Sequence, residues 1–210
     1  MPRLSDGNRQ KTTYMMQPPK SIAGYRLGLA SGSPRRRELL AMLDIPFHIV
    51  EPLEIDENYP ADLEAREVPL FLSRLKADAY RPSMADDDLY ITADTVVIVG
   101  EEVLGKPCDE AEAVGMLRRL SGRSHEVVTG VTVFTRRKTT SFKALTTVEF
   151  ATVPDDEIEE YVGHYHPFDK AGAYGIQEWI GAVGIRRIDG SFYNVMGLPV
   201  HRLWEVLKQF

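Results

Sequence analysis

Short apolar runs, separated by glycine, proline and charged residues, divide the chain into alternating extended and helical segments. Compact runs rich in apolar and β-branched residues predict buried strands at residues 25–30, 46–50 and 89–99. Apolar residues three or four positions apart predict helices at residues 34–43, 63–80, 109–120 and 198–210, and Pro154 followed by three acids predicts the start of another. Two β-rich runs predict a long hairpin over residues 126–152 with a basic turn at 136–138, and a second hairpin is predicted over 182–195 with its turn at Asp189 and Gly190.

This order of elements mixes strand–helix units with antiparallel hairpins and contains no internal repeat. We therefore expect an α/β fold with a mixed central sheet and flanking helices, or the alternative of an α+β sheet domain. A length of 210 residues suits one compact domain or two closely joined lobes. Residues 1–22 have no apolar periodicity and are predicted to be a disordered extension, which leaves residues 23–210 as the folded domain; the alternative for the basic N-terminal segment is a mitochondrial presequence.

Composition narrows the classes of function. Hydrophobic residues make up 43% of the chain and charged residues 27%, and no apolar stretch approaches the length of about 18 residues that crosses a bilayer. The net charge of -6 argues against a general nucleic-acid binder, whose surface is usually basic. Cys108 is the single cysteine, so no intrachain disulfide can form, and a reducing, cytoplasmic compartment is expected.

Residues 31–37, Ser-Gly-Ser-Pro-Arg-Arg-Arg, are the strongest chemical signal in the sequence. Ser33 suits a helix N-cap and Pro34 the first helical position, so the arginines fall in a first turn where the helix dipole disfavours cations. A bound phosphate group would compensate, held by free main-chain N–H groups and by Arg35 or Arg36. The alternative is an ordinary capped helix whose arginines are solvated or paired with Glu51, Glu54 or Glu57.

Asp94 lies within an otherwise apolar strand, where an unpaired carboxylate would be costly. It therefore needs a metal, a cation or a place at the end of a strand; the alternative is a structural aspartate that caps a turn. Glu57, in an acidic loop, is a second oxygen ligand of the kind that Mg²⁺ prefers when it bridges to phosphates, or simply a solvated acid.

Two lysines and one loop complete the candidates. Lys106 lies between Gly105 and Pro107, and Lys76 lies on the predicted helix 63–80; each could contact a phosphate or remain a surface lysine. In the glycine-punctuated segment 169–177, Gln177 has the amide donor and acceptor needed to recognise a uracil or thymine ring, unless it is a solvated glutamine. No Walker-type phosphate loop occurs, which excludes a P-loop nucleoside triphosphatase.

The order of the motifs is more specific than any one of them. They are Leu-Ala-Ser-Gly-Ser-Pro-Arg-Arg at 29–36, Ala-Asp-Thr at 93–95, Gly-Lys-Pro at 105–107, Ser-Gly-Arg at 121–123, Thr-Gly-Val at 129–131, the segment 169–177, Gly-Ser at 190–191 and Asn-Val-Met-Gly-Leu-Pro at 194–199. From Tyr25 to the C-terminus the chain resembles the Maf (septum-formation) family of nucleoside triphosphate pyrophosphatases. The resemblance implies two lobes around a deep cleft, a fold similar to that of inosine triphosphate pyrophosphatases, a homodimer, and dependence on a divalent metal such as Mg²⁺ or Mn²⁺.

The resemblance also implies roles for individual residues. Asp94 would be the base that activates water and, with Glu57, a metal ligand. Phosphate contacts would fall on Ser33, Arg36, Lys76, Lys106 and Asp169. Arg35, Thr95 and Gln177 match the subgroup that hydrolyses dTTP and UTP to monophosphate and pyrophosphate, a house-cleaning activity on the nucleotide pool. The alternatives are another non-standard nucleotide, such as 7-methyl-GTP, and a non-catalytic nucleotide-binding regulator of cell division.

Overall fold

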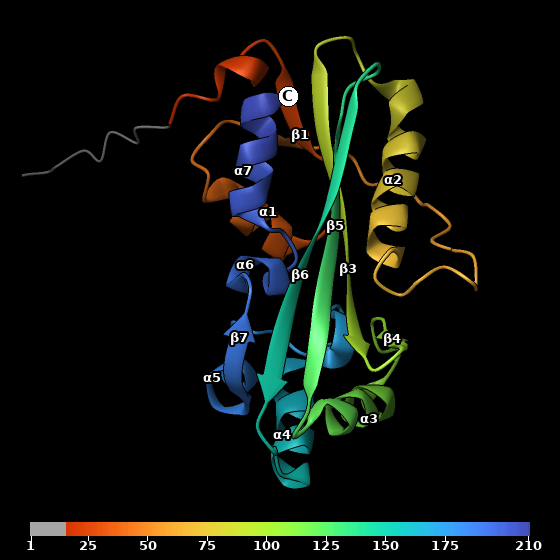
Figure 1. The fold of residues 1–210 in the computed structure, drawn as a ribbon, viewed down its shortest axis with the longest axis vertical. Coiled ribbons are helices and arrows are strands. Elements are labelled where there is room, and N and C mark those ends of the chain that lie inside the picture. The colour runs from red at the N-terminus through yellow and green to blue at the C-terminus, as the bar shows by residue number, and fades with distance from the viewer. Residues whose placement is uncertain (1–15) are drawn as a thin grey trace, which may run out of the picture.

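A computed structural model describes residues 16–210 as one mixed sheet flanked by helices (Figure 1). The strand order is β2-β1-β3-β5-β6-β7, with β4 paired to β3. Strand β1 (Arg26–Leu29) runs parallel to β2 (His48–Ile49) and to β3 (Asp88–Val99). Strands β4 (Glu102–Leu104) and β5 (Ser124–Phe134) are antiparallel to β3, and β6 (Thr139–Phe150) and β7 (Ile185–Asp189) continue the antiparallel part.

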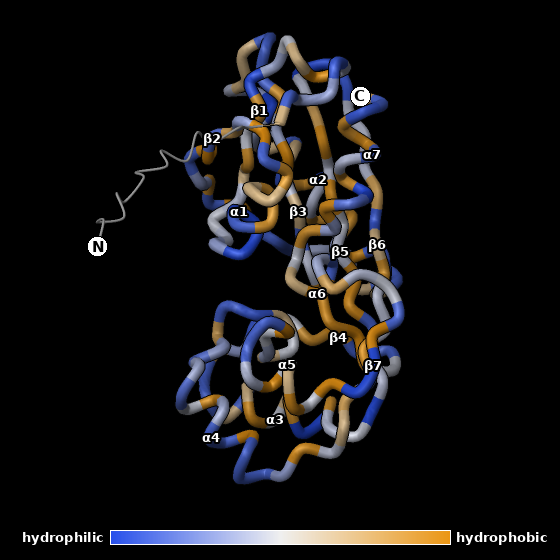
Figure 2. The backbone as a smooth tube through the Cα atoms, turned by 90° about the vertical axis from the view of Figure 1, so that its left-hand side faces the viewer, coloured by the Kyte–Doolittle hydropathy of each residue, from blue (hydrophilic) through white to orange (hydrophobic). Residues whose placement is uncertain are grey.

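The helices are distributed over two lobes that share the long strands β3, β5 and β6 (Figure 1). In the upper lobe, α1 (Pro34–Ala41) and α7 (Val200–Gln209) lie on one side of the strands, and α2 (Val68–Tyr80) lies on the other. The lower lobe contains α3 (Glu110–Leu120), α4 (Asp155–Tyr165) and α5 (Trp179–Gly184), and the short α6 (Phe192–Met196) lies between the lobes. Figure 2 shows the two lobes from the side, with α1, β1 and β2 above and α3, α4 and α5 below.

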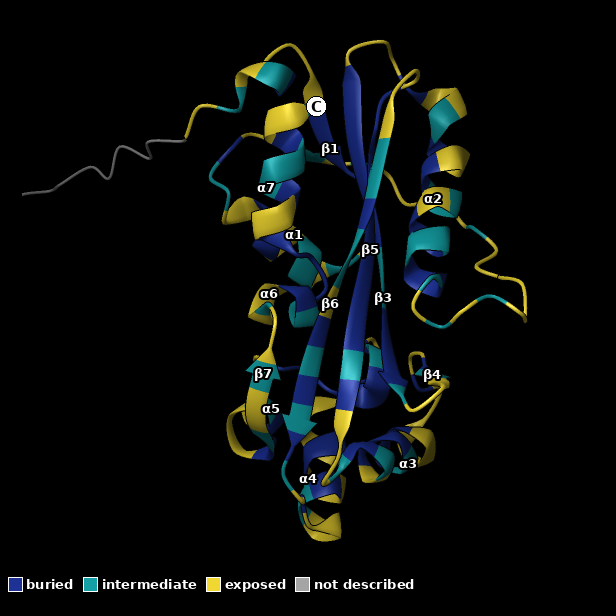
Figure 3. Ribbon diagram, viewed as in Figure 1, coloured by how far each residue is buried: buried dark blue, intermediate teal, exposed yellow. Residues whose placement is uncertain are grey.

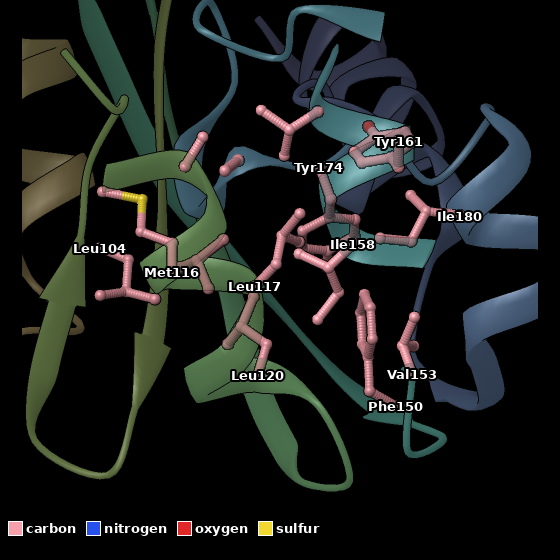
Figure 4. Close-up of a cluster of buried hydrophobic side chains, with 14 of the residues drawn as sticks. Leu104, Met116, Leu117, Leu120, Phe150, Val153, Ile158, Tyr161, Tyr174 and Ile180 are labelled. Carbon is pink, nitrogen blue, oxygen red and sulfur yellow. The ribbon is translucent and has the colours of Figure 1, made fainter. Parts of the chain in front are cut away.

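Each lobe has its own apolar core. In the lower lobe, α3, α4 and α5 pack against the strands through residues such as Leu117, Phe150 and Ile180 (Figure 4). In the upper lobe, Leu29 and Leu39 lie in a cluster that also includes residues of β3, β5 and α7. A third cluster joins α2 to the opposite face of the sheet. Strands β3 and β5 are consequently buried along most of their length (Figure 3) and provide a rigid support for side chains between the lobes.

Most predicted elements are confirmed, with shifted ends. The helix predicted from residue 63 begins at Val68, because Pro69 lies in its first turn and suits that position. The long hairpin is confirmed as β5 and β6. The hairpin predicted over residues 182–195 is wrong: β7 pairs with β6, and the residues after Gly190 form α6, where the side chain of Ser191 accepts a hydrogen bond from the Asn194 N–H.

The predicted N-terminal extension is described only in part. Residues 1–15 lie outside the described residues. Ile22 is buried, and Ser21 Oγ donates a hydrogen bond to the main-chain oxygen of Leu207, which attaches this segment to α7.

Candidate active site

A polar cleft opens at one edge of β3, in the interval between its two neighbours on that side. Strand β1 pairs with β3 as far as Ile91, and β4 pairs with it again from Val97. Between these points no strand within residues 16–210 pairs with this edge of β3. Because side chains alternate along a strand, this edge presents Asp94 toward the α2 face and Thr95 toward the opposite face. Both residues line the same cleft of about 930 Å³, part of which is open to solvent.

The loop from β1 into α1 forms one wall of this cleft. Ser33 Oγ accepts a hydrogen bond from the Arg36 N–H at 3.4 Å, and Pro34 is the first helical residue, so the predicted helix start is confirmed. The loop follows the carboxyl end of a parallel strand, which is where open α/β sheets commonly bind ligands. The N-terminal end of α1 therefore faces the cleft that Asp94 lines.

Lys76 connects the two predicted metal-binding carboxylates. Its Nζ lies 2.7 Å from Asp94 Oδ1 and 3.1 Å from Glu57 Oε2. The side chains of Lys76 and Asp94 are only 15% and 13% exposed, whereas that of Glu57 is 52% exposed. The cation that a carboxylate inside an apolar strand requires is thus Lys76, which comes from α2.

A glycine in β5 explains how α2 comes close enough to deliver this lysine. Gly130 is paired with Asp94 across the β3–β5 ladder. A Cβ atom on Gly130 would lie 2.3 Å from the main-chain carbon of Pro69, at the start of α2. Only glycine permits this approach of helix to sheet.

The guanidinium group of Arg36 is hydrogen-bonded mainly within the protein. Its Nε donates to the oxygen of Gly197 at 2.9 Å, Nη1 donates to Ala93 O at 2.8 Å and to Ser31 Oγ at 3.4 Å, and Nη2 donates to Thr95 Oγ1 at 3.1 Å. Burial lowers the pKa of Arg36 below its ordinary value, and the nearby Asp94 carboxylate opposes that shift. Four of its five N–H groups are used, so a single Nη2 hydrogen remains for a ligand.

Arg35 spans the cleft instead. Its Nη1 lies 2.5 Å from Asp169 Oδ2, and its Nη2 donates to the main-chain oxygen of Asp169 at 3.2 Å. Partial burial raises the pKa of Asp169, but hydrogen bonds from Lys170 and Arg35 outweigh it and hold this pKa below its ordinary value. The glutamates at 51, 54 and 57, considered from sequence as partners for the arginines, do not pair with Arg35 or Arg36.

A second, smaller cavity of about 520 Å³, part of which is open to solvent, adjoins the first. Its lining includes Gln177, Tyr174 and Gly175 from the lower lobe and Val97 and Val127 from the long strands. Six residues line both cavities: Ser33, Arg35, Arg36, Thr95, Lys106 and Asp169. The two cavities are therefore parts of one cleft between the lobes, and the structure brings all ten residues selected from sequence to it.

Lys106 differs from the other cations of the cleft. Lys76 is paired with carboxylates, Arg35 with Asp169, and Arg36 with main-chain oxygens. Among the described residues, Lys106 forms no ion pair, and its side chain is exposed. It is the lysine most available to an anion in this cleft.

The structure also reveals a supporting network that sequence reasoning missed. Lys170 Nζ lies 2.7 Å from Asp169 and 3.1 Å from Glu178, and Glu178 accepts a hydrogen bond from the Tyr161 hydroxyl at 2.5 Å. Tyr161 also accepts a hydrogen bond from the Gly175 N–H at 3.1 Å. These contacts fix the ends of the segment that carries Gln177. The Asp-Lys pair at 169–170 was a visible signal, whereas nothing local pointed to Tyr161.

The donor set is compatible with a divalent metal that binds together with a nucleotide. The described residues contain no cluster of three or more histidine, cysteine or acidic side chains that could hold a metal alone. Mg²⁺ commonly uses only one or two carboxylates and takes its other ligands from phosphates and water. Asp94 and Glu57, both paired with the Lys76 ammonium, are the two carboxylates of the cleft that would serve as such ligands.

No helix in residues 16–210 combines the length and the apolar character needed to cross a membrane. The fold and the cleft define an α/β protein with two lobes and a polar site between them. A solved structure of the same fold is that of the Staphylococcus aureus Ham1 protein, with a TM-score of 0.52, 16% identity, and coverage of 88% of this chain and 98% of that one.

The sequence identifies the family within that fold. Residues 26–210 match the family of Maf-like proteins, and the chain belongs to it. It is 50% identical over 191 residues to a protein of Parabacteroides distasonis named dTTP/UTP pyrophosphatase, covering 91% of this chain and 99% of the relative. It is 55% identical over 192 residues to a protein of the same name from Porphyromonas gingivalis, covering 90% and 96%.

Proposed function

We propose that this protein hydrolyses dTTP and UTP to the nucleoside monophosphate and pyrophosphate, and so removes these nucleotides or modified forms of them from the pool. The observation that carries the proposal is that one cleft joins a carboxylate–lysine cluster to a cavity lined by Thr95 and Gln177. Relatives about half identical over nine-tenths of the chain bear the name of this activity.

The base would occupy the smaller cavity. The Gln177 side-chain amide can accept from N3–H and donate to O4 of a uracil or thymine ring. Thr95 Oγ1 already accepts from Arg36 and lies 3.0 Å from Thr129 Oγ1, so its position is fixed before a nucleotide arrives. Arg35 and Asp169 lie where this cavity meets the larger one, next to the expected position of the sugar and the first phosphate.

The triphosphate would extend into the larger cavity. Main-chain N–H groups at the Ser33 end of α1 and the ammonium of Lys106 would bind phosphate oxygens. Arg36 would add positive charge and its remaining Nη2 hydrogen. These groups would stabilise the charge that develops on the pyrophosphate leaving group, which is the main task of a protein in phosphoryl chemistry.

Asp94 would orient and deprotonate the water that attacks the α-phosphorus. Lys76, held between Asp94 and Glu57, fixes the direction of both carboxylates. We propose that Asp94 and Glu57 hold Mg²⁺ or Mn²⁺ when the nucleotide binds; a bound divalent ion would neutralise phosphate charge and activate water. A cytoplasmic location, which rests on the single cysteine, and a homodimer, which rests on the family resemblance, are further parts of the proposal.

Asp94→Asn tests the central role. We expect a fall in kcat of at least about a hundredfold, since general bases typically contribute 10²–10⁴. The thermal midpoint should change little, because asparagine keeps the shape of the side chain. Asp78→Asn, at an exposed aspartate later in α2, is the matched control and should retain activity.

The substrate class is tested by pyrophosphate release from dTTP, UTP, CTP, 7-methyl-GTP and ITP, with and without Mg²⁺ or Mn²⁺. The proposal predicts metal-dependent release, fastest with dTTP and UTP. Faster release from 7-methyl-GTP or ITP would assign the protein to a different nucleotide. Absence of release from every triphosphate would favour a non-catalytic nucleotide-binding role.

A further inference from the structure

The segment that carries Glu57 is held to the rest of the protein by few contacts. Residues 51–60 form neither helix nor strand. Apart from the Pro60 oxygen, which accepts from the nearby Leu63 N–H at 3.0 Å, two polar contacts join this segment to the described structure: the Leu53 N–H donates to the Tyr80 hydroxyl at 3.1 Å, and Glu57 pairs with Lys76 at 3.1 Å. The position of Glu57 therefore depends on the hydrogen bond by which Tyr80 holds the main chain at Leu53, four residues before Glu57.

Tyr80 is well placed to act as a fixed support. It is the last residue of α2 and lies one helical turn after Lys76 on the same face of the helix. Only 4% of its surface is exposed, and it packs in a cluster with Ala30, Tyr90 and Phe134, against which Ile55 also packs. Its ring lies edge-on to that of Tyr90, with centroids 6.5 Å apart.

Tyr80 also borders the cleft in which the chemistry is proposed. The larger cavity is lined by Tyr80, Leu53 and Ile55 together with Lys76, Glu57 and Asp94. The hydroxyl of Tyr80 therefore holds the main chain of the loop at the wall of the cleft, while its ring is anchored in the core beneath.

We propose that Tyr80 is a positioning residue: its hydroxyl fixes the main chain at Leu53 so that Glu57 can reach the carboxylate–lysine cluster. The inference rests on the proposed function, in which Glu57 contributes to binding the metal–nucleotide complex. Without the hydroxyl, the Leu53 N–H loses its acceptor and residues 51–59 keep one polar contact to the described structure, the one made by Glu57 itself. Glu57 then has to order the loop as well as bind.

The test separates the hydroxyl from the ring. Tyr80→Phe keeps the packing of the ring and removes only the acceptor. Tyr90→Phe is the matched control, because Tyr90 belongs to the same cluster, but its hydroxyl bonds to Asp88 at 2.9 Å and it does not line the cleft. Both variants should fold, as judged by circular dichroism and thermal unfolding.

Hydrogen exchange of the nucleotide-free protein is the first measurement. In Tyr80→Phe the Leu53 amide should exchange about 5-fold faster, the size expected for the loss of one hydrogen bond between neutral groups. Tyr90→Phe should leave this amide unchanged. Equal exchange at Leu53 in wild type and Tyr80→Phe would overturn the inference, whatever the activity of the protein.

A double-mutant cycle with Glu57→Gln is the second measurement. Tyr80→Phe alone should raise the metal concentration needed for half-maximal activity about 2–10-fold, with a smaller effect on kcat. In the Glu57→Gln background the same change should have little further effect, because residues that act through one another are not additive. A full effect of Tyr80→Phe in that background would show that Tyr80 does not act through Glu57.

The two measurements also separate this inference from the proposed function. If wild type releases no pyrophosphate, the proposed function fails while the exchange result still tests the link between Tyr80 and the loop. If wild type is active and Tyr80→Phe matches it in both measurements, the inference fails and the proposed function stands.

Discussion

Arg35, at the start of α1, holds Asp169 from the other side of the cleft through both its side-chain carboxylate and its main-chain oxygen. The Asp169 side chain is 56% exposed, so this ion pair adds little to folding stability. The location of the ion pair matters more than its energy. Both residues line the smaller cavity, in which the base is proposed to bind, and the larger cavity. A nucleotide that spans the two must pass this pair, and its phosphates would compete with Asp169 for Arg35.

Arg35→Ala should therefore affect binding far more than folding. We expect kcat/KM for dTTP and UTP to fall about 10–100-fold, as for loss of a hydrogen-bonding group that contacts a charged partner. Unfolding free energy measured with urea should change by less than about 1 kcal/mol. Arg37→Ala, at the exposed neighbouring arginine outside both cavities, should leave both quantities near wild type. Equal losses in the two variants would mean that general positive charge, not Arg35 itself, is required.

Substitution of Arg36, in contrast, should reduce folding stability substantially. Arg36→Met removes the donors to the oxygens of Ala93 and Gly197 and to Thr95, so buried acceptors lose their partners. We expect a loss of about 2–5 kcal/mol in unfolding free energy, measured with urea. Arg37→Met should lie within about 0.5 kcal/mol of wild type, as is usual on the surface. Unchanged stability with lost activity would assign Arg36 to the phosphates alone.

The contrast between the two arginines marks a limit of sequence analysis. The Ser-Pro-Arg-Arg pattern predicted a capped helix with cations at its start, because capping depends on neighbouring residues. Arg36 is instead committed to Ala93 and Gly197, which lie far away in the chain. Asp94 was recognised as needing a cation, but the choice of Lys76 follows from the packing of α2 over Gly130, which is also non-local.

The one wrong element has a similar origin. The turn residues Asp189 and Gly190 suggested a local hairpin, yet β7 pairs with β6, about 40 positions earlier by register. The local signal for a helix after Gly190 was Ser191, which caps α6. By contrast, the hairpin of β5 and β6 was predictable because its strands are adjacent in sequence and its turn is basic.

Gly175 is a position where a small change should alter base recognition. A Cβ atom there would lie 2.9 Å from Gln177 Nε2 and 2.6 Å from Glu178 Cδ. Glu178 is held by Lys170 and Tyr161, so the Gln177 amide would have to move. Gly175→Ala should raise KM for UTP and reduce the preference for UTP over CTP, and overpacking should cost about 1–3 kcal/mol of unfolding free energy.

Gly163→Ala is the control for this substitution. Gly163 lies on an exposed part of α4, and a Cβ atom there meets nothing within 4 Å. Alanine should stabilise the helix by up to about 1 kcal/mol and leave the UTP/CTP preference unchanged. If Gly175→Ala also retained the wild-type preference, Gln177 would not be the residue that reads the base.

A buried histidine lies behind the base cavity and should govern part of the acid stability. His125 Nε2 lies 2.8 Å from the hydroxyl of Tyr174, which lines that cavity, and burial lowers the pKa of His125 from 6.5 to about 4. Below pH 6.5 the unfolded chain binds a proton that the folded protein refuses until about pH 4, so stability is complete above this window and falls as the pH falls through it. The full loss is about 3 kcal/mol.

His125→Gln, which can still bond to Tyr174 but does not titrate, should lose correspondingly less unfolding free energy, measured with urea, between these pH values. His201→Gln, at an exposed position on α7, should follow the wild-type curve. An identical pH dependence in wild type and His125→Gln would mean that His125 is not the group responsible.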